Sequence, residues 1–270
     1  MSQNIWSTIV KEAKKVAAEE PSLVSLIHET IINQPDFAHA LAFHLSGKFQ
    51  DQTISAVAYN HLFNDIMTES PCIVEASIAD LKAIRQRDPA TKCYVIPMLY
   101  FKGFLALQVS RLAHHLWTKG REILASHIQS RNSEVFSVDI HPAAKIGKGI
   151  LLDHASSFVC GETATIGDNV SILHEVTLGG SGKECGDRHP KVSSNVLIGA
   201  GAKLLGNIQI GVGAKIGAGS VVLTDVPAHT TFVGVPAKQI GKPTHKNPSK
   251  FMQHELPCDL SGDYQIQKKI

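Results

Sequence analysis

Cysteine is scarce in this 270-residue chain, and its spacing matches no metal-binding knuckle. The five cysteines are odd in number and include no Cys-x-x-Cys pair: Cys72, Cys93, Cys160, Cys185 and Cys258. A disulfide framework uses an even set of cysteines, and cysteine-based structural zinc sites use closely spaced pairs. We therefore expect reduced thiols, no metal and a cytoplasmic protein.

Long apolar runs and a strong charge of one sign are also absent. The most apolar stretch, residues 104–109, is far too short to span a membrane. Lys11 and Lys14 come before any long apolar run, so we expect no signal peptide. The formal net charge is +2 and no long Lys/Arg cluster occurs. These features exclude the usual signatures of membrane and nucleic-acid binding.

Up to about residue 135 the apolar residues recur with helical spacing. Trp6, Ile9 and Ala13 fall on one face of a helix with 3.6 residues per turn. The pair Ser70-Pro71 predicts the start of a helix over 70–86, which Asp-Pro at 88–89 ends. A proline at 97 predicts a further helix over 97–117. We therefore expect residues 1–137 to form a helical domain.

From about residue 138 the period changes to six. A glycine often follows the aliphatic residue, and small residues stand two positions before five of the aliphatic residues, at Ala144, Ala164, Ala202, Ala214 and Ser220. This pattern is typical of a parallel β-helix, in which three hexads make one triangular coil. The aliphatic positions are Ile140, Ile146, Leu152, Ile166, Ile172, Leu178, Ile198, Leu204, Ile210, Ile216 and Val222.

Two breaks interrupt this period. Leu152 and Ile166 are fourteen residues apart, and Leu178 and Ile198 are twenty apart. The second break predicts a loop over 179–193 that leaves the coil. Long excursions from a rigid scaffold usually carry function. The expected fold class is α+β, with an all-helical domain (1–137), a left-handed parallel β-helix of hexapeptide repeats (138–241) and a mobile polar tail (242–270).

Histidines and carboxylates gather near these breaks. His154 follows Asp153 where the first phase break begins, and His189 ends the extruded loop beside Arg188. Asp139 comes just before the first hexads. A histidine is suited to take a hydroxyl proton at neutral pH, and a carboxylate beside it holds its tautomer. Such residues would suit acyl transfer to an alcohol, and acyltransferases are the enzymes that hexad proteins resemble as a class.

The chain resembles the serine acetyltransferase family over roughly nine tenths of its length. The motifs that carry the resemblance are Arg-Asp-Pro-Ala at 87–90, Val-Asp-Ile-His-Pro at 138–142, Leu-Asp-His-Ala at 152–155, Gly-Asp-Arg-His-Pro at 186–190 and Ile-Gly-Ala-Gly-Ala at 198–202. Many members have Asp-His-Ala-Thr-Gly where this chain has Ser156 and Ser157 after Asp-His-Ala. The hydroxyl is kept at 156, and glycine is replaced by serine at 157.

The resemblance implies an enzyme that moves the acetyl group of acetyl-CoA to L-serine, the first step of cysteine biosynthesis. It implies His154 as general base, Asp139 as its partner and His189 as a second imidazole in the serine pocket. Substrate contacts would come from Asp88, Asp153 and Arg188, since a guanidinium binds a carboxylate bidentately and acidic groups suit an ammonium. Along the CoA arm would lie Gly180, Ala200, Lys215 and Ala218.

The resemblance also implies partners. It predicts a trimer, or a dimer of trimers joined through the helical domains, and feedback inhibition by L-cysteine. It predicts that the C-terminal Ile270 inserts into O-acetylserine sulfhydrylase, with its carboxylate acting as a substrate mimic.

Three other functions remain open at this stage. The chain could be a hexapeptide-repeat acetyltransferase acting on a sugar or an antibiotic. It could be a zinc hydratase similar to the gamma-class carbonic anhydrases, with His154, His174 and His189 as ligands. The third alternative is a non-catalytic scaffold. A substrate panel and metal analysis distinguish them.

Overall fold

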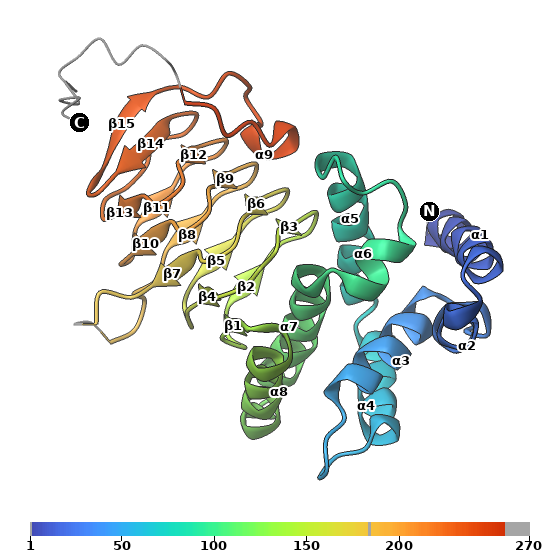
Figure 1. Cartoon of the computed structure of the whole chain (residues 1–270). Coiled ribbons are helices and arrows are strands. Elements are labelled where there is room, and N and C mark those ends of the chain that lie inside the picture. Colours follow the sequence, from blue (N-terminus) through green and yellow to red (C-terminus); the bar gives the residue numbers. More distant parts are fainter. Residues whose placement is uncertain (1, 183–184, 257–270) are drawn as a thin grey trace, which may run out of the picture.

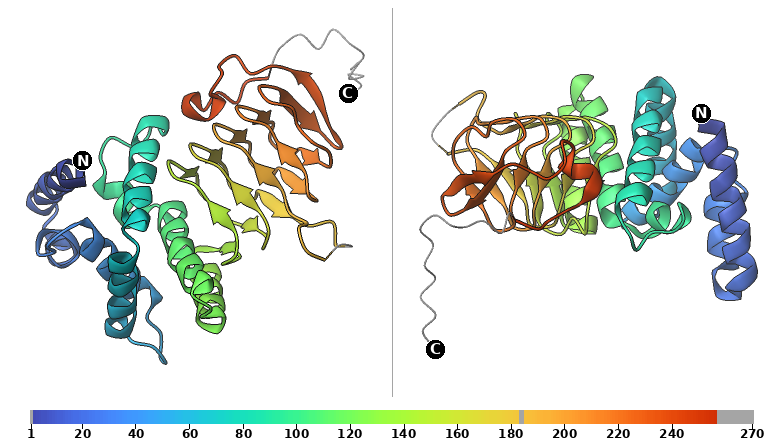
Figure 2. Two further views of the ribbon diagram at one scale, coloured as in Figure 1. Left: turned by 180° about the vertical axis from the view of Figure 1, so that it is seen from behind. Right: turned by 90° about the horizontal axis from the view of Figure 1, so that it is seen from above.

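The computed structural model describes residues 2–182 and 185–256 and divides into two halves that lie side by side (Figures 1 and 2). A helical half leads into a stack of short parallel strands. The helices α1 to α4 lie farthest from the last strands, and α5, α7 and α8 lie next to the first ones. Among the described helices, none combines the length and apolarity needed to cross a bilayer.

The helical half is built from elements of very different length. Their bounds are α1 (Ser2–Glu19), the 3-10 turn η1 (Pro21–Leu23), α2 (Val24–Ile27), the π-helical turn η2 (His28–Ile32), α3 (Phe37–Phe49), α4 (Ala56–Glu69), α5 (Pro71–Arg87), α6 (Val95–Tyr100), α7 (Lys102–Thr118) and α8 (Glu122–Phe136).

Local side-chain chemistry fixes several helix ends. The carboxylate of Asp36 accepts a hydrogen bond from the backbone N–H of His39 at 2.9 Å and caps α3. Helix α5 begins at Pro71, where a missing N–H costs nothing, and the extended backbone of Asp88 ends it. The helix predicted over 70–86 is therefore confirmed.

The prediction of one continuous helix over 97–117 is wrong. The chain forms α6 and α7 as separate helices, with extended backbone at Phe101 between them (φ −78°, ψ 101°). A Cβ on Gly103 would lie 2.0 Å from the carbonyl oxygen of Leu152. The first turn of α7 thus touches the backbone of the coil, and the break at Phe101 turns α7 onto it.

The second half is a parallel β-helix with three sheets, as the hexads predict. Each strand pairs with the strand one coil later: β1-β4-β7-β10-β13 form sheet A, β2-β5-β8-β11 sheet B and β3-β6-β9-β12-β14 sheet C, which β15 extends. Their bounds are β1 (Val138–Ile140), β2 (Lys145–Ile146), β3 (Leu151–Leu152), β4 (Phe158–Cys160), β5 (Thr165–Ile166), β6 (Ser171–Ile172), β7 (Thr177–Gly179), β8 (Lys191–Val192), β9 (Leu197–Ile198), β10 (Lys203–Leu205), β11 (Gln209–Ile210), β12 (Lys215–Ile216), β13 (Val221–Val222), β14 (Thr231–Gly234) and β15 (Ala237–Gly241).

The hexad positions stack in register through the coil interior. Along sheet A, Ile140 aligns with Cys160, Cys160 with Leu178, and Leu178 with Leu204. Cys160 thus occupies an interior position of the coil, although it is not one of the aliphatic positions of the hexads. Burial raises the pKa of its thiol to about 12, so this cysteine is a packing residue.

Both phase breaks leave the coil as surface segments. Residues 153–157 form a turn between sheets C and A. The long loop spans 180–190 and not 179–193, because Gly179 belongs to β7 and Lys191 to β8. Elsewhere the coils stack closely: a Cβ on Gly199 would lie 2.6 Å from the backbone nitrogen of Ala218 in the next coil. This contact explains the glycine that follows an aliphatic residue in the repeat.

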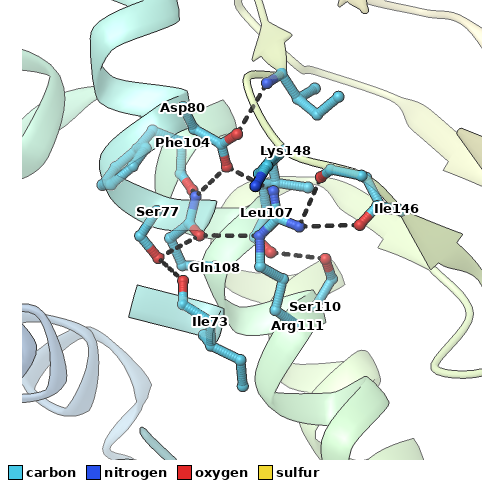
Figure 3. A network of polar contacts seen from close by, with 12 residues as sticks. Ile73, Ser77, Asp80, Phe104, Leu107, Gln108, Ser110, Arg111, Ile146 and Lys148 are labelled. Atoms are coloured by element: carbon cyan, nitrogen blue, oxygen red, sulfur yellow. Dashed lines mark hydrogen bonds and ion pairs between the residues drawn. The ribbon is translucent and has the colours of Figure 1, made fainter. Parts of the chain in front are cut away.

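A buried polar network joins the two halves (Figure 3). The Arg111 guanidinium, from α7, donates to Asp80 of α5 at 2.6 Å and to the carbonyl oxygens of Ile146 and Gly147 at 3.2 and 3.0 Å. The second carboxylate oxygen of Asp80 accepts from the backbone N–H of Ile150 at 2.8 Å. These bonds fix α5 and α7 against the first coil.

The tail expected to be mobile from residue 242 is packed as far as residue 256. The short helix α9 (Pro248–Phe251) contacts α5, and Pro248 and Ser249 are buried. The hydroxyl of Ser171 donates to the carbonyl oxygen of Ser249 at 2.8 Å, and the ammonium of Lys215 donates to that of Glu255. Polar residues of sheet C thus hold the segment 242–256, although this segment has no apolar period. Residues 257–270, including Ile270, lie outside the described residues.

Candidate functional site

Most of the predicted functional residues lie at two corners of the triangular coil; Asp88, Asp139 and Lys215 lie elsewhere. We call the junction of sheets C and A, residues 153–157, 173–176, 199–202 and 217–220, the turn corner. We call the junction of sheets A and B, residues 141–144, 161–164 and 180–190, the loop corner. His154 belongs to the turn corner and His189 to the loop corner, with sheet A between them.

The turn corner presents His154 to solvent. Its backbone has a positive φ of 55°, which is uncommon outside glycine, and its side chain is 74% exposed. The imidazole Nε2 lies 3.9 Å from an oxygen of Asp153, and its ring lies 5.9 Å from that of His174, edge to face. This side chain is open to a substrate from outside the coil.

The loop corner buries His189, which is only 7% exposed. The backbone N–H of Thr163 donates to its Nδ1 at 3.2 Å, and the Thr163 hydroxyl lies 2.9 Å from the same atom. That hydroxyl oxygen accepts the backbone N–H groups of Arg188 and His189, so its own proton points to Nδ1. The neutral imidazole therefore carries its proton on Nε2 and can donate from there.

Burial lowers the pKa of His189, and the neighbouring charges of Arg188 and Lys191 lower it further. Its Nε2 faces two glycines. A Cβ on Gly161 would lie 2.1 Å from Nε2, and one on Gly180 would lie 3.5 Å from it. The absence of side chains at these positions makes room for the ring.

Arg188 lies next to His189 and is paired within the chain. Its guanidinium donates to the carboxylate of Glu162 at 2.6 Å and to the carbonyl oxygen of Gly186 at 3.0 Å. The hydrogen bond from Arg188 is the main cause that lowers the pKa of Glu162. Glu162 therefore orients a guanidinium that remains 30% exposed at its side chain.

Asp139 lies on β1 and accepts a hydrogen bond from the side-chain amide of Gln129 at 2.7 Å. Among the described residues, no hydrogen bond or ion pair joins Asp139 to His154. Asp88 lies at the end of α5, where its carboxylate accepts from the backbone of Ala90 and the hydroxyl of Thr91, both at 2.8 Å.

Three of the four residues assigned to the CoA arm divide between the corners, and Lys215 lies on β12. Ala200 and Ala218 are neighbours at the turn corner, where Gly219 donates to the carbonyl oxygen of Ala200 at 2.8 Å. Gly180 begins the long loop at the loop corner. Lys215 is 5% exposed and is bonded to Glu255, and burial lowers the pKa of its ammonium.

Several residues that hold the candidate side chains are not among those predicted from the sequence. Thr163 holds His189, Glu162 holds Arg188, and Gln129 holds Asp139. Glu162 and Thr163 lie at the same corner as the long loop, one coil earlier. An exact alignment of the coils therefore predicts that these two residues contact the loop. Gln129 belongs to α8 and has no such signal.

The histidine trio considered for zinc is not gathered in one place, because His189 lies at the other corner from His154 and His174. Within residues 2–182 and 185–256, no group of three His, Cys, Asp or Glu side chains has an arrangement that could hold a metal ion.

Comparison with known proteins identifies close relatives. The family model "Serine acetyltransferase, N-terminal" matches residues 5–109, and that of the bacterial transferase hexapeptide, six repeats, matches 189–224. The serine acetyltransferase of Salmonella typhimurium is 51% identical over 251 residues, 93% of this chain and 92% of that protein. The Escherichia coli K12 protein of the same name is 50% identical over the same shares.

Solved structures agree in fold and include bound molecules. A serine acetyltransferase in complex with cysteine has a TM-score of 0.93 at 45% identity, covering 95% of this chain and 100% of that one. The Neisseria gonorrhoeae enzyme in complex with serine has 0.85 at 52%, covering 87% and 96%. The Brucella abortus enzyme in complex with coenzyme A has 0.87 at 47%, covering 88% and 96%.

Proposed function

The chain belongs to the serine acetyltransferase family, and we propose that it transfers the acetyl group of acetyl-CoA to the hydroxyl of L-serine. The products are O-acetyl-L-serine and CoA, in the first step of cysteine biosynthesis from serine. One structural observation carries the proposal: an exposed imidazole and a buried donor imidazole stand at the two corners that flank sheet A. A proton acceptor and a hydrogen-bond donor are what acyl transfer to a hydroxyl requires.

In this mechanism His154 is the general base. It takes the proton of the serine hydroxyl as that oxygen attacks the thioester carbonyl. When the tetrahedral intermediate collapses, the C–S bond breaks and the imidazolium returns the proton to the sulfur of CoA. Asp139 stabilises the imidazolium, and His189 donates from Nε2 inside the serine pocket.

Charge complementarity fixes the zwitterionic substrate. Arg188 binds the serine carboxylate, and Asp88 and Asp153 bind its ammonium. Glu162 and the carbonyl oxygen of Gly186 each accept from one terminal nitrogen of the Arg188 guanidinium, which leaves further N–H donors for the substrate carboxylate.

The site is completed between copies of the chain in a trimer. Sheet A separates the turn corner from the loop corner. In the proposed trimer, His154 and His189 of one chain therefore contribute to different sites. A three-fold arrangement places the turn corner of one copy against the loop corner of the next. Gly180 of one copy and Ala200, Lys215 and Ala218 of its neighbour then flank a single CoA arm.

Complementation tests this arrangement. The variants His154→Ala and His189→Ala are each expected to be inactive alone, and mixed trimers refolded from both are expected to recover activity. Recovery requires sites that take one corner from each variant; no recovery in proven mixed trimers contradicts a shared site.

L-cysteine is proposed as a feedback inhibitor that competes with serine, because it differs only by sulfur for oxygen and keeps the ammonium and carboxylate. Steady-state inhibition at several serine concentrations distinguishes competition from action elsewhere. The cysteine complex of a relative supports the proposal.

The proposed assembly is a dimer of trimers joined through the helical half, whose exposed apolar side chains include Val24, Leu26 and Phe43. Mass measurement in solution distinguishes the hexamer from a trimer. A cytoplasmic location is proposed from the unpaired thiols of Cys72, Cys93, Cys160 and Cys185.

O-acetylserine sulfhydrylase is proposed as a partner that binds the C-terminal Ile270. The basic residues Lys268 and Lys269 precede it, so the affinity should depend on salt. Titration of a C-terminal decapeptide into the sulfhydrylase, with and without Ile270, tests this; equal binding of both peptides contradicts it.

The experiment that tests the reaction is thiol release from acetyl-CoA with L-serine, a sugar and chloramphenicol as acceptors. We expect thiol release with L-serine as acceptor and none with the sugar or chloramphenicol. A preference for the sugar or the antibiotic would favour the alternative hexapeptide-repeat acetyltransferase.

A further inference from the structure

The turn that carries His154 has an unusual backbone. Within five residues, His154, Ala155 and Ser157 have positive φ angles of 55°, 58° and 58°, although none is glycine. Each such residue is strained, and the conformation persists only where its surroundings determine it. The position of the His154 imidazole therefore depends on whatever holds this turn.

The coil holds one side of the turn. The side chain of Ala155 is fully buried. The backbone N–H of Ser157 donates to Ser137 at 2.9 Å, and that of Glu175 donates to the carbonyl oxygen of Ser156 at 2.8 Å. These bonds attach the turn to the coils on either side of it.

The helical half holds the other side through the first residues of α7. The ammonium of Lys102 donates to the hydroxyl of Ser156 at 2.5 Å. The next residue, Gly103, lies so close that an added Cβ would be 2.0 Å from the oxygen of Leu152 and 3.0 Å from Cβ of Ala155. The break at Phe101 directs this end of α7 at the turn.

We propose that Lys102 is a positioning residue for the reaction, holding the 153–157 turn, and with it the His154 imidazole, through the Ser156 hydroxyl. This inference rests on the proposed acetyl transfer to serine. The lysine belongs to the helical half and the base to the β-helix, so the helical half takes part in arranging the base as well as in assembly.

The sequence of this chain makes the contact more important. Position 156 is serine and not threonine, and position 157 is serine and not glycine. Serine lacks the methyl group that restricts the χ1 angle of threonine, so the Lys102 bond is what selects the hydroxyl's rotamer. Serine at 157 also resists the positive φ that glycine adopts freely. Both differences increase the dependence of the turn on Lys102.

The test compares Lys102→Met, Lys102→Arg, Ser156→Ala and the double variant Lys102→Met/Ser156→Ala with the wild type. Lys119→Met, an exposed lysine at the opposite end of α7, is the matched control. We expect Lys102→Met to lower kcat about tenfold with the KM for serine changed less than about twofold, because a slightly displaced base loses rate more than binding. Arg keeps the donor and should recover most of the rate.

The double variant distinguishes positioning from general destabilisation. If Lys102 acts through Ser156, the double variant should lose no more kcat than Lys102→Met alone. The proposal is wrong if the losses of kcat in the two single variants multiply in the double variant. It is also wrong if Lys102→Met has the kcat of the wild type. A fall in thermal stability with kcat unchanged at a temperature where the variant is folded would also overturn it.

An activity-independent measurement separates this inference from the proposed function. The ring Cε1–H resonance of His154, assigned with His154→Ala, should shift in Lys102→Met and not in Lys119→Met. If the wild type acetylates no serine, the proposed reaction fails while the resonance still reports whether Lys102 positions the ring. An unshifted resonance rejects the positioning role.

Discussion

Nη2 of Arg111 lies 2.6 Å from Oδ2 of Asp80, and the two side chains are 8% and 0% exposed. This ion pair joins α7 to α5, and both side chains also bond to Gln108. Further hydrogen bonds reach the backbone of Ile146, Gly147 and Ile150 in the first coil (Figure 3). Burial raises the pKa of Asp80, and the charge of Arg111 opposes that rise. The attraction between the two charges thus compensates for part of the hydration that each group loses on burial.

Removing one partner should therefore be costly. Arg111→Met leaves a buried carboxylate without its countercharge, and we expect a loss of about 3–5 kcal/mol in the free energy of unfolding. Urea denaturation measures it, with the exposed Arg121→Met as control. A loss near that of the control would show that the pair is not needed for stability.

His154→Ala should lower turnover with serine at least about a hundredfold, the scale of a lost general base. Because the side chain is exposed, the melting temperature should stay close to that of the wild type. His61→Ala, an exposed histidine on α4, should keep full activity. Turnover above about a tenth of wild type in the His154 variant contradicts its role as base.

Gly161→Ala should displace the imidazole of His189. The new Cβ would meet Cδ2 and Nε2 of a buried ring at 2.1 Å, and Thr163 prevents the ring from swinging away. We expect kcat/KM for serine to fall at least about tenfold. Gly47→Ala, on α3 with no atom near its added Cβ, should leave the activity unchanged. Equal activities would mean that His189 does not contribute in this position.

Ser157→Gly should stabilise the protein by about 0.5–1 kcal/mol. A left-handed backbone costs a non-glycine residue about 1–2 kcal/mol, and glycine's extra unfolded-state entropy offsets part of that gain. Ser193→Gly, in the coil at negative φ, should destabilise instead. Thermal or urea unfolding compares the two, and a destabilised Ser157→Gly contradicts the strain at this position.

The buried His44 predicts a pH dependence of stability. Its Nε2 donates to the carbonyl oxygen of Leu99 at 2.8 Å, and burial lowers its pKa from 6.5 to about 4. As pH falls, the unfolded chain binds this proton first, so stability is complete above pH 6.5 and declines towards pH 4, by about 3 kcal/mol in total.

The variant His44→Gln removes this titration, so its free energy of unfolding should decline less than that of the wild type between pH 6.5 and 4. His61→Gln, which is exposed, should follow the wild-type curve. Parallel curves for His44→Gln and wild type would show that His44 is not the group responsible.

Much of the fold follows from local sequence signals. The hexads predict the β-helix because one interior residue per strand must be aliphatic, and Pro71 with Asp88 predicts α5. The break at Phe101 has no such signal, since it depends on the contact of Gly103 with Leu152 about fifty residues later. Cys160 filled an aliphatic position because packing accepts a small thiol there.

The candidate residues were predictable as types and motifs, but their arrangement was not. Thr163 and Glu162 contact the long loop from the preceding coil, and only an exact alignment of the coils reveals this contact. The packed segment 242–256 was missed because its partners, Ser171 and Lys215, are polar residues on the outer face of sheet C. Polar burial leaves no periodic signal in a sequence.

The one-to-one register of the coils restricts how such a chain can change length during evolution. A single residue inserted inside a strand would move every later interior side chain to the wrong face, whereas a whole coil of three hexads could be gained or lost without altering the corners of the others. Smaller insertions are tolerated only where the chain already leaves the coil, at residues 153–157 and 180–190. The two places free to vary in length are thus the ones that carry His154 and His189.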